Sequence, residues 1–139
     1  MSEIDRRTGM ETLSEDECWS LMKKTAVGRL AVSIGGVPDI FPVNYVVDGR
    51  SIVVNTAPGT KLAAAVFGEG VAFEVDSVDE DRKLGWSIVI QGTGTEIEKL
   101  DDLMDAESLD VEPWADGYKG RFLRIDTDRI SGRRIPGHD

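Results

Sequence analysis

The chain has 139 residues, 40% of them hydrophobic, which suffices for one compact domain with its own core and is too short for two. Its formal net charge of −10 disfavours binding to nucleic acids or anionic membranes, which depends on basic surface. The single cysteine and the single histidine exclude an internal disulfide and a histidine-rich metal site, and they disfavour Ser-His-Asp catalysis. With no signal peptide and no membrane-spanning apolar run, we expect a cytoplasmic protein without a metal site.

The first predicted element is a short amphipathic helix over residues 14–24. Ser14 and Glu17 have the spacing of a capping box, in which each side chain satisfies a backbone N–H of the other residue. We interpret Cys18 as a packing residue, because the charged residues near it in sequence are acids, which do not lower a thiol pKa. Residues 1–12 are expected to be a flexible N-terminus.

Three antiparallel strands are predicted next, joined by tight turns. Gly35-Gly36 and Asp48-Gly49 favour two-residue hairpins. Pro38 and Pro42 cannot donate hydrogen bonds to a neighbouring strand, so the second strand is expected at a sheet edge or with a bulge. These strands cover residues 27–34, 37–47 and 51–56.

The second half of the chain adds three strands and two short helices to the prediction. The expected strands cover residues 71–76, 85–97 and 120–130, with a charged loop over 77–84, and the expected helices cover 60–67 and 101–110. A total of about six strands with two or three helices indicates a mainly β protein built as a small closed or partly closed antiparallel barrel. We expect a single domain over residues 1–139 with a flexible tail at 135–139.

Lys61 is the first candidate for a functional role. It lies in the first turn of the predicted helix 60–67, where a cation is unfavourable unless an anion shares the site. Thr60 adds a hydroxyl and the helix start adds free N–H groups, so the segment suits a phosphate, although it does not match a P-loop. The alternative, in which Thr60 caps the helix and Lys61 is a solvated surface lysine, is about equally favoured by the spacing alone.

Three further features are weaker candidates on their own. Asn44 and Tyr45 interrupt an apolar strand, so one of them is expected to face a pocket and the other the opposite side, with packing by Tyr45 as the default. Trp86 offers a flat apolar face and is more typical of a core or interface residue. The acidic pairs Glu80/Asp81 and Asp101/Asp102 are interpreted as solvated.

Six segments in order resemble the pyridoxamine 5'-phosphate oxidase-like flavin-binding proteins of the small actinobacterial type. They are TAVGRLAVS, FPVNYVVDG, NTAPGTKLAAA, VAFEVD, GWSIVIQGTG and LRIDTDRISGRR, and together they span nearly the whole chain up to Arg134. The resemblance implies a split β-barrel homodimer with two FMN sites at the subunit interface, and an oxidoreductase acting on a small organic substrate. No catalytic side chain is implied, because the flavin itself carries the hydride chemistry.

The resemblance also assigns the cofactor-binding residues by position. The flavin ring would lie against the backbone of Pro42, Val43, Asn44 and Tyr45. The ribityl phosphate would lie among Thr56, Thr60, Lys61 and Leu62. Trp86 and Ser87 would reach in from the partner chain.

Two positions depart from the pattern of this family. Relatives often carry arginine where this chain has Asn55 and a basic residue where it has Gln91, and a neutral amide cannot clamp a phosphate as a guanidinium does. We therefore expect weaker FMN binding, with Arg29, Arg82 or Lys83 adding to the electrostatics. Two other hypotheses stay open: a barrel that binds a deazaflavin or haem in the same cleft, and a cofactor-free dimer that serves as an interaction module.

Overall fold

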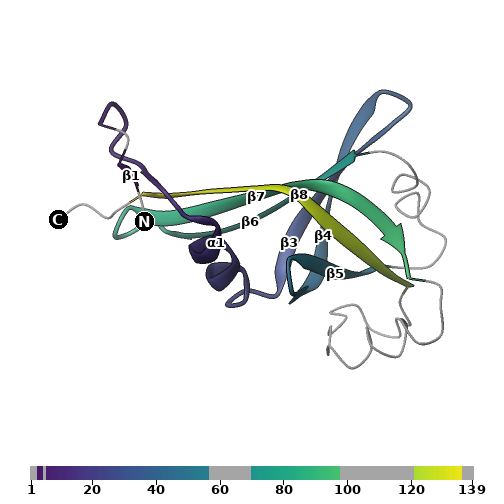
Figure 1. Cartoon of the computed structure of the whole chain (residues 1–139). Coiled ribbons are helices and arrows are strands. Elements are labelled where there is room, and N and C mark those ends of the chain that lie inside the picture. The colour runs from purple at the N-terminus through teal and green to yellow at the C-terminus, as the bar shows by residue number, and fades with distance from the viewer. Residues whose placement is uncertain (1–2, 5, 57–69, 98–120, 136–139) are drawn as a thin grey trace.

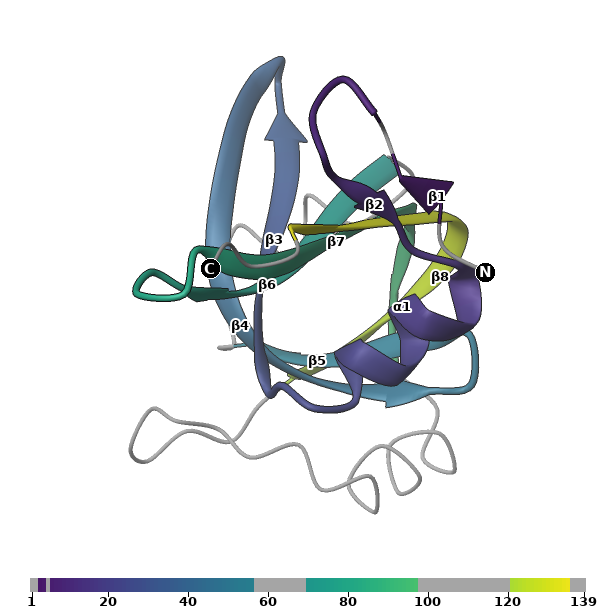
Figure 2. The ribbon, with the colours of Figure 1, turned by 90° about the vertical axis from the view of Figure 1, so that its left-hand side faces the viewer.

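The computed structural model describes residues 3–4, 6–56, 70–97 and 121–135 of the chain. Six strands form a closed antiparallel ring in the order β8, β5, β4, β3, β6, β7, and β7 pairs back to β8 (Figure 1, Figure 2). In chain order they are β3 (Val27–Ile34), β4 (Val37–Asp48), β5 (Ser51–Thr56), β6 (Gly70–Asp79), β7 (Leu84–Glu96) and β8 (Arg121–Ile135). This mainly β split barrel confirms the predicted fold class and the expected number of strands in the ring.

Helix α1 (Glu15–Met22) precedes the ring and packs against β8. The predicted capping box is confirmed: Ser14 Oγ accepts a hydrogen bond from the backbone N–H of Glu17, and Glu17 Oε1 accepts one from the N–H of Ser14, both at 3.2 Å. The helix ends at Met22, two residues before the predicted end, and Lys23 is its C-cap. Cys18 is buried, as its interpretation as a packing residue requires.

The N-terminal segment that we expected to be flexible contains two short strands, β1 (Glu3–Ile4) and β2 (Glu11–Thr12). They pair with each other, and β2 pairs with the end of β8 through Glu11 opposite Arg134. The Arg134 guanidinium also lies 3.5 Å from Glu11 Oε2 and 3.7 Å from Glu17 Oε2. The segment thus extends the sheet beyond the ring.

The interior of the ring is filled by apolar side chains, because every second residue of each strand points inward. Tyr45 and Phe73 pack edge to face with ring centroids 5.0 Å apart. Gly28 lies directly beneath Phe73, and a Cβ on Gly28 would come within 2.3 Å of Phe73 Cζ. The fully buried side chains of the ring include Leu30, Ile52, Val54, Phe73, Val75, Ile88, Ile90, Leu123 and Ile125.

The prediction for the proline-containing strand is partly right. β4 lies inside the sheet, because residues 37–44 pair with β3 and residues 44–48 pair with β5. No described strand pairs with residues 37–43 on their other edge, and Pro38 and Pro42 both lie in that half. The prolines are therefore tolerated where the strand behaves locally as an edge.

Two of the three strands in the second half, β6 and β8, are longer than predicted. β6 continues to Asp79 and β7 begins at Leu84, so much of the expected charged loop belongs to a hairpin. β8 continues to Ile135 instead of ending at residue 130. The predicted helices 60–67 and 101–110 and the tail beyond Ile135 lie outside the described residues.

Packing beneath Phe73 leads to a stability prediction for Gly28→Ala. The added methyl group overlaps the Phe73 ring, which is 1% exposed, so we expect the free energy of unfolding to fall by about 1–3 kcal/mol. Gly70→Ala is the matched control, because its Cβ would meet nothing closer than the Gly92 carbonyl oxygen at 3.9 Å. Urea denaturation of both variants measures the difference, and equal stability of the two would contradict the packing described here.

Candidate functional site

The β4 segment predicted to carry the flavin ring presents alternating faces. Val43 and Tyr45 point into the barrel and are 8% and 4% exposed, whereas Pro42 is exposed and Asn44 half-buried on the outer face. The Tyr45 hydroxyl contacts Thr25 Oγ1 and donates a 2.5 Å hydrogen bond to the Met22 carbonyl oxygen, which ties β4 to the end of α1. Packing by Tyr45 is thus confirmed, and burial raises the pKa of its phenol. Within this segment, the outer face therefore presents the side chains of Pro42 and Asn44.

Asn44 pairs in register with Asn55 on β5. Asn55 is 9% exposed, and its Oδ1 atom is buried without a hydrogen-bond partner among the residues that the structure describes. A buried acceptor without a donor costs about 1–3 kcal/mol, which native proteins seldom tolerate without a reason. The register also brings the Pro42–Tyr45 segment beside the start of the segment that contains Lys61. Thr60, Lys61 and Leu62 lie outside the described residues, and Thr56 is described in its backbone only.

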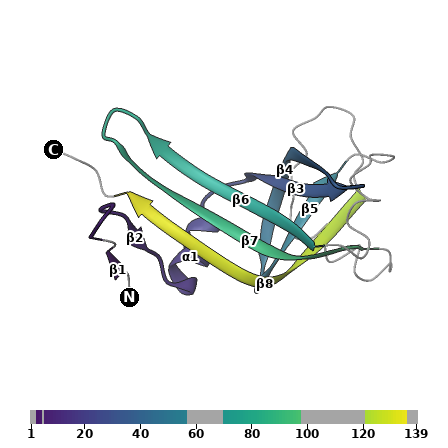
Figure 3. The same ribbon diagram turned by 90° about the horizontal axis from the view of Figure 1, so that it is seen from above.

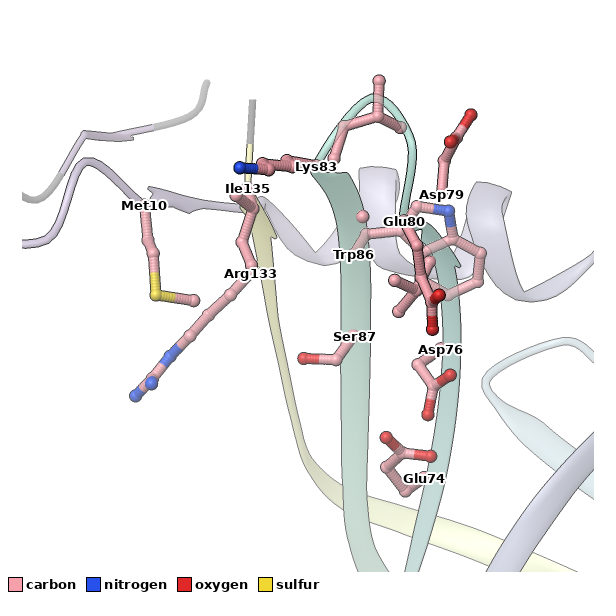
Figure 4. Close-up of a pocket in the computed structure, with 13 residues that line it drawn as sticks. Met10, Glu74, Asp76, Asp79, Glu80, Lys83, Trp86, Ser87, Arg133 and Ile135 are labelled. Carbon is pink, nitrogen blue, oxygen red and sulfur yellow. The ribbon is translucent and has the colours of Figure 1, made fainter. Parts of the chain in front are cut away.

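Trp86 and Ser87, the two residues predicted to come from a partner chain, line a pocket of about 560 Å³ along the β6–β7 hairpin (Figure 4). Viewed from above, this hairpin and the end of β8 extend away from β3, β4 and β5 (Figure 3). Residues of the β4 site do not line the pocket, so within one chain the two groups of predicted residues lie apart. The lining residues are Met10, Glu74, Asp76, Val78, Asp79, Glu80, Lys83, Leu84, Gly85, Trp86, Ser87, Arg133 and Ile135.

A charge cluster that the sequence analysis missed lies along this pocket. Arg29 Nη1 is 3.2 Å from Glu74 Oε1 and 3.2 Å from Asp76 Oδ2, so one guanidinium serves two carboxylates. Burial, followed by the neighbouring Asp76, raises the pKa of Glu74 to about 7, although Arg29 opposes the shift. The available signal was the alternation in VAFEVD, which puts both acids on the outer face with Val75 between them pointing inward.

Four other charged residues considered in the sequence analysis lie exposed to solvent in a turn. Glu80, Asp81, Arg82 and Lys83 are exposed in the turn between β6 and β7, and the Arg82 backbone N–H donates to Asp79 Oδ1 at 3.1 Å. Since Arg29 is engaged by two carboxylates, the pair of acids competes for the charge that we had expected to help hold a phosphate.

Cysteine chemistry and metal chemistry receive no support from the described residues. Burial, then Glu17 and Glu15, raise the pKa of the Cys18 thiol, which keeps it protonated and unreactive. Among the described ranges, no group of three or more histidine, cysteine or acidic side chains is arranged to hold a metal ion. None of the helices in this part of the chain has the length and apolar character needed to cross a membrane.

Comparisons with known proteins give a consistent result over most of the chain. The sequence profile of the family described as pyridoxamine 5'-phosphate oxidase matches residues 14–134. The structure of a protein described as an FAD-binding protein from Mycobacterium smegmatis is 35% identical, with a TM-score of 0.76 over 88% of this chain and 95% of that chain. A Corynebacterium glutamicum protein, provisionally assigned as a pyridoxamine 5'-phosphate oxidase, is 32% identical, with a TM-score of 0.83 over 94% of this chain and 96% of its own. An uncharacterised Mycobacterium tuberculosis protein is 32% identical over 129 residues, 88% of this chain and 84% of that protein.

The raised pKa of Glu74 predicts a pH-dependent contribution to stability. A carboxyl group whose pKa rises from 4.5 in the unfolded chain to about 7 in the folded protein binds more protons when folded. Its contribution is therefore complete below pH 4.5 and is lost as the pH rises through 7. In Glu74→Gln this contribution is absent, so the difference in free energy of unfolding between wild type and variant should change across pH 4.5 to 7.

Chemical denaturation at several pH values measures that difference. Asp81→Asn, which removes an exposed carboxylate from the β6–β7 turn, is the matched control for the loss of one negative charge. A difference between wild type and Glu74→Gln that stays constant across this range would contradict the shifted pKa.

Proposed function

The chain belongs to the pyridoxamine 5'-phosphate oxidase family, and from this premise we propose that it binds FMN and acts as a flavin-dependent oxidoreductase on a small organic substrate. The observation that carries the proposal is the pairing of Asn44 with Asn55, which joins in one place the two segments assigned to the flavin ring and to the phosphate. A 35% identical protein described as FAD-binding supports a flavin as the cofactor.

Asn55 Oδ1 has no hydrogen-bond partner among the described residues, so the groups that a ligand could offer this atom indicate whether the site suits a flavin. An acceptor needs a donor, and a flavin offers donors in its ribityl hydroxyl groups and its ring N3–H. A phosphate oxygen offers none at neutral pH. This oxygen atom therefore fits the sugar chain or the ring of a flavin rather than its phosphate.

The remaining residues then have separate tasks. The backbone of Pro42, Val43, Asn44 and Tyr45 would hold the ring, and Tyr45 keeps β4 in place through its hydrogen bond to the Met22 carbonyl oxygen. In this proposal Lys61 neutralises the phosphate, and Thr56, Thr60 and Leu62 are the other residues assigned to it. Bound flavin supplies the two-electron chemistry, and backbone groups near the ring adjust its electronics.

A homodimer completes the proposed site. Trp86 and Ser87 lie apart from β4 within one chain, so a second copy is needed to bring this pair to the flavin. A monomer in solution, measured by light scattering, would remove this part of the proposal.

We do not extend the proposal to oxidation of pyridoxamine 5'-phosphate itself. The chain has 16 basic residues against 26 acidic ones, so few cations are available to hold the phosphate of a substrate in addition to that of the cofactor. The family name thus describes the fold and the flavin chemistry better than the substrate.

The phosphate assignment predicts the behaviour of Lys61→Ala. Removal of a charge-assisted contact should weaken FMN binding by about 10- to 100-fold and leave riboflavin, which has no phosphate, unaffected. Fluorescence titration of the cofactor-stripped protein with FMN, FAD, riboflavin and a deazaflavin measures this. Lys24→Ala, which removes an exposed lysine after α1, controls for the overall change of charge.

The outcomes of this titration separate the hypotheses. Tight binding of FMN by the wild type with loss in Lys61→Ala supports the proposal. Unchanged FMN affinity in Lys61→Ala would refute the phosphate assignment. Tight binding of the deazaflavin alone would favour that cofactor, and wild-type protein that binds none of the four would favour the cofactor-free dimer.

Asn55→Leu tests the orphaned acceptor separately. Without a buried unpaired oxygen, the flavin-free protein should gain about 1 kcal/mol in free energy of unfolding. The same change should weaken the binding of FMN and of riboflavin by the same factor, because the lost contact is to the ring or the ribityl chain, which the two ligands share. A loss confined to FMN would instead assign Asn55 to the phosphate.

A further inference from the structure

The pocket along the β6–β7 hairpin contains an electrostatic imbalance. Glu74 and Asp76 share the single guanidinium of Arg29, and the three side chains remain 32%, 31% and 49% exposed. One negative charge is therefore left over when both acids are ionised. A second positive charge would be stabilised there. In the free protein a proton on Glu74 fills this role, as the raised pKa of this carboxyl group, about 7, indicates.

We propose that this pocket is the substrate site and that the substrate is a small organic cation with an apolar body, an assignment that rests on the proposed flavin function. Trp86 links the two: it lines the pocket and is also the residue expected to reach the flavin of the partner. A ligand held against Trp86 therefore lies beside the expected position of the cofactor.

The rest of the pocket matches both halves of such a ligand. The positive group would lie against the Glu74–Asp76 pair, of which the shared Arg29 guanidinium neutralises one charge. The apolar body has Val78 and Ile135, which are 68% and 43% exposed and would be shielded from water by a ligand. At about 560 Å³ the pocket is of the size that small molecules occupy.

The basic residues of the pocket do not reverse this polarity. Figure 4 shows Arg133 and the Lys83 nitrogen on one side of β7, whereas Glu74, Asp76 and Glu80 lie on the other side. An anionic ligand on the β6 side would face three carboxylates. The acidic half of the pocket is thus separated by β7 from its basic residues.

Release of the Glu74 proton should make cation binding depend on pH. Glu74 is faced by Arg29 from β3 and by Asp76 on its own strand. Asp79 at the end of β6, Glu80 and Lys83 in the turn, and Arg133 on β8 line the same pocket. Its direct partner on β7, Val89, is uncharged. A bound cation adds a positive charge to this group, so it displaces the Glu74 proton and binds more tightly as the pH rises through 7.

Calorimetric titration with three probes of one shape tests the proposal: benzyltrimethylammonium, benzyl alcohol and benzoate. The cation carries a permanent charge, so any pH dependence of its binding belongs to the protein. We expect the cation to bind most tightly and benzoate most weakly, with an affinity for the cation that rises up to about tenfold from pH 6 to 8. Equal binding of the three probes would overturn the proposal.

Variants of the acidic residues test whether the cation binds in this pocket. Glu74→Gln should weaken the cation at pH 8 by about threefold to tenfold and abolish the pH dependence, whereas Asp81→Asn, in the adjacent turn, should do neither. Unchanged cation binding in both Glu74→Gln and Asp76→Asn would also overturn the proposal. These titrations need no flavin, so a failed flavin titration refutes the proposed function and the substrate role, while the cation site is judged by its own measurement.

Discussion

Closure of the ring by β8 is the constraint on which the rest of the structure depends. Residues 121–126 of this strand pair with β5, and residues 123–135 pair with β7, so the middle of its first half has partners on both edges. The register shifts between Gln91 and Gly92, which bends the strands as a barrel requires. Gly92 permits the approach, because a Cβ there would lie 2.0 Å from the Asp126 carbonyl oxygen.

Closure decides where ligands can bind. The inside of a six-stranded ring is filled by side chains such as Leu30 and Phe73, so binding sites must lie on its outer faces. One outer row crosses the sheet from Pro42 through Arg29 and Glu74 to Val89, as the registers of β4, β3, β6 and β7 show. Arg29 thus stands between the proposed flavin strand and the cation pocket, and its charge is drawn toward the pocket side.

The sequence was informative wherever a local rule sufficed. The capping box at Ser14, the hairpin turns and the alternation of apolar residues depend on neighbours within a few positions, and all were predicted correctly. The length of β8 was underestimated, because polar residues such as Arg133 and Arg134 stay in the strand through pairing with β7 and β2, which are distant in sequence. Glu74 was missed for the same reason: its environment depends on Arg29, 45 residues away, and no local pattern contains that contact.

The two proposed sites have opposite polarity, and the net charge of −10 acts on them differently. At the proposed flavin site the net negative charge opposes a phosphate, so the proposal requires a local cation, Lys61, and neutral contacts such as the one assigned to Asn55. In the pocket the same field assists a cation, and Glu74 and Asp76 concentrate it. A phosphate in the pocket would face the carboxylates of Glu74 and Asp76. Together, the two proposals imply that cofactor and substrate are distinguished by charge as well as by shape.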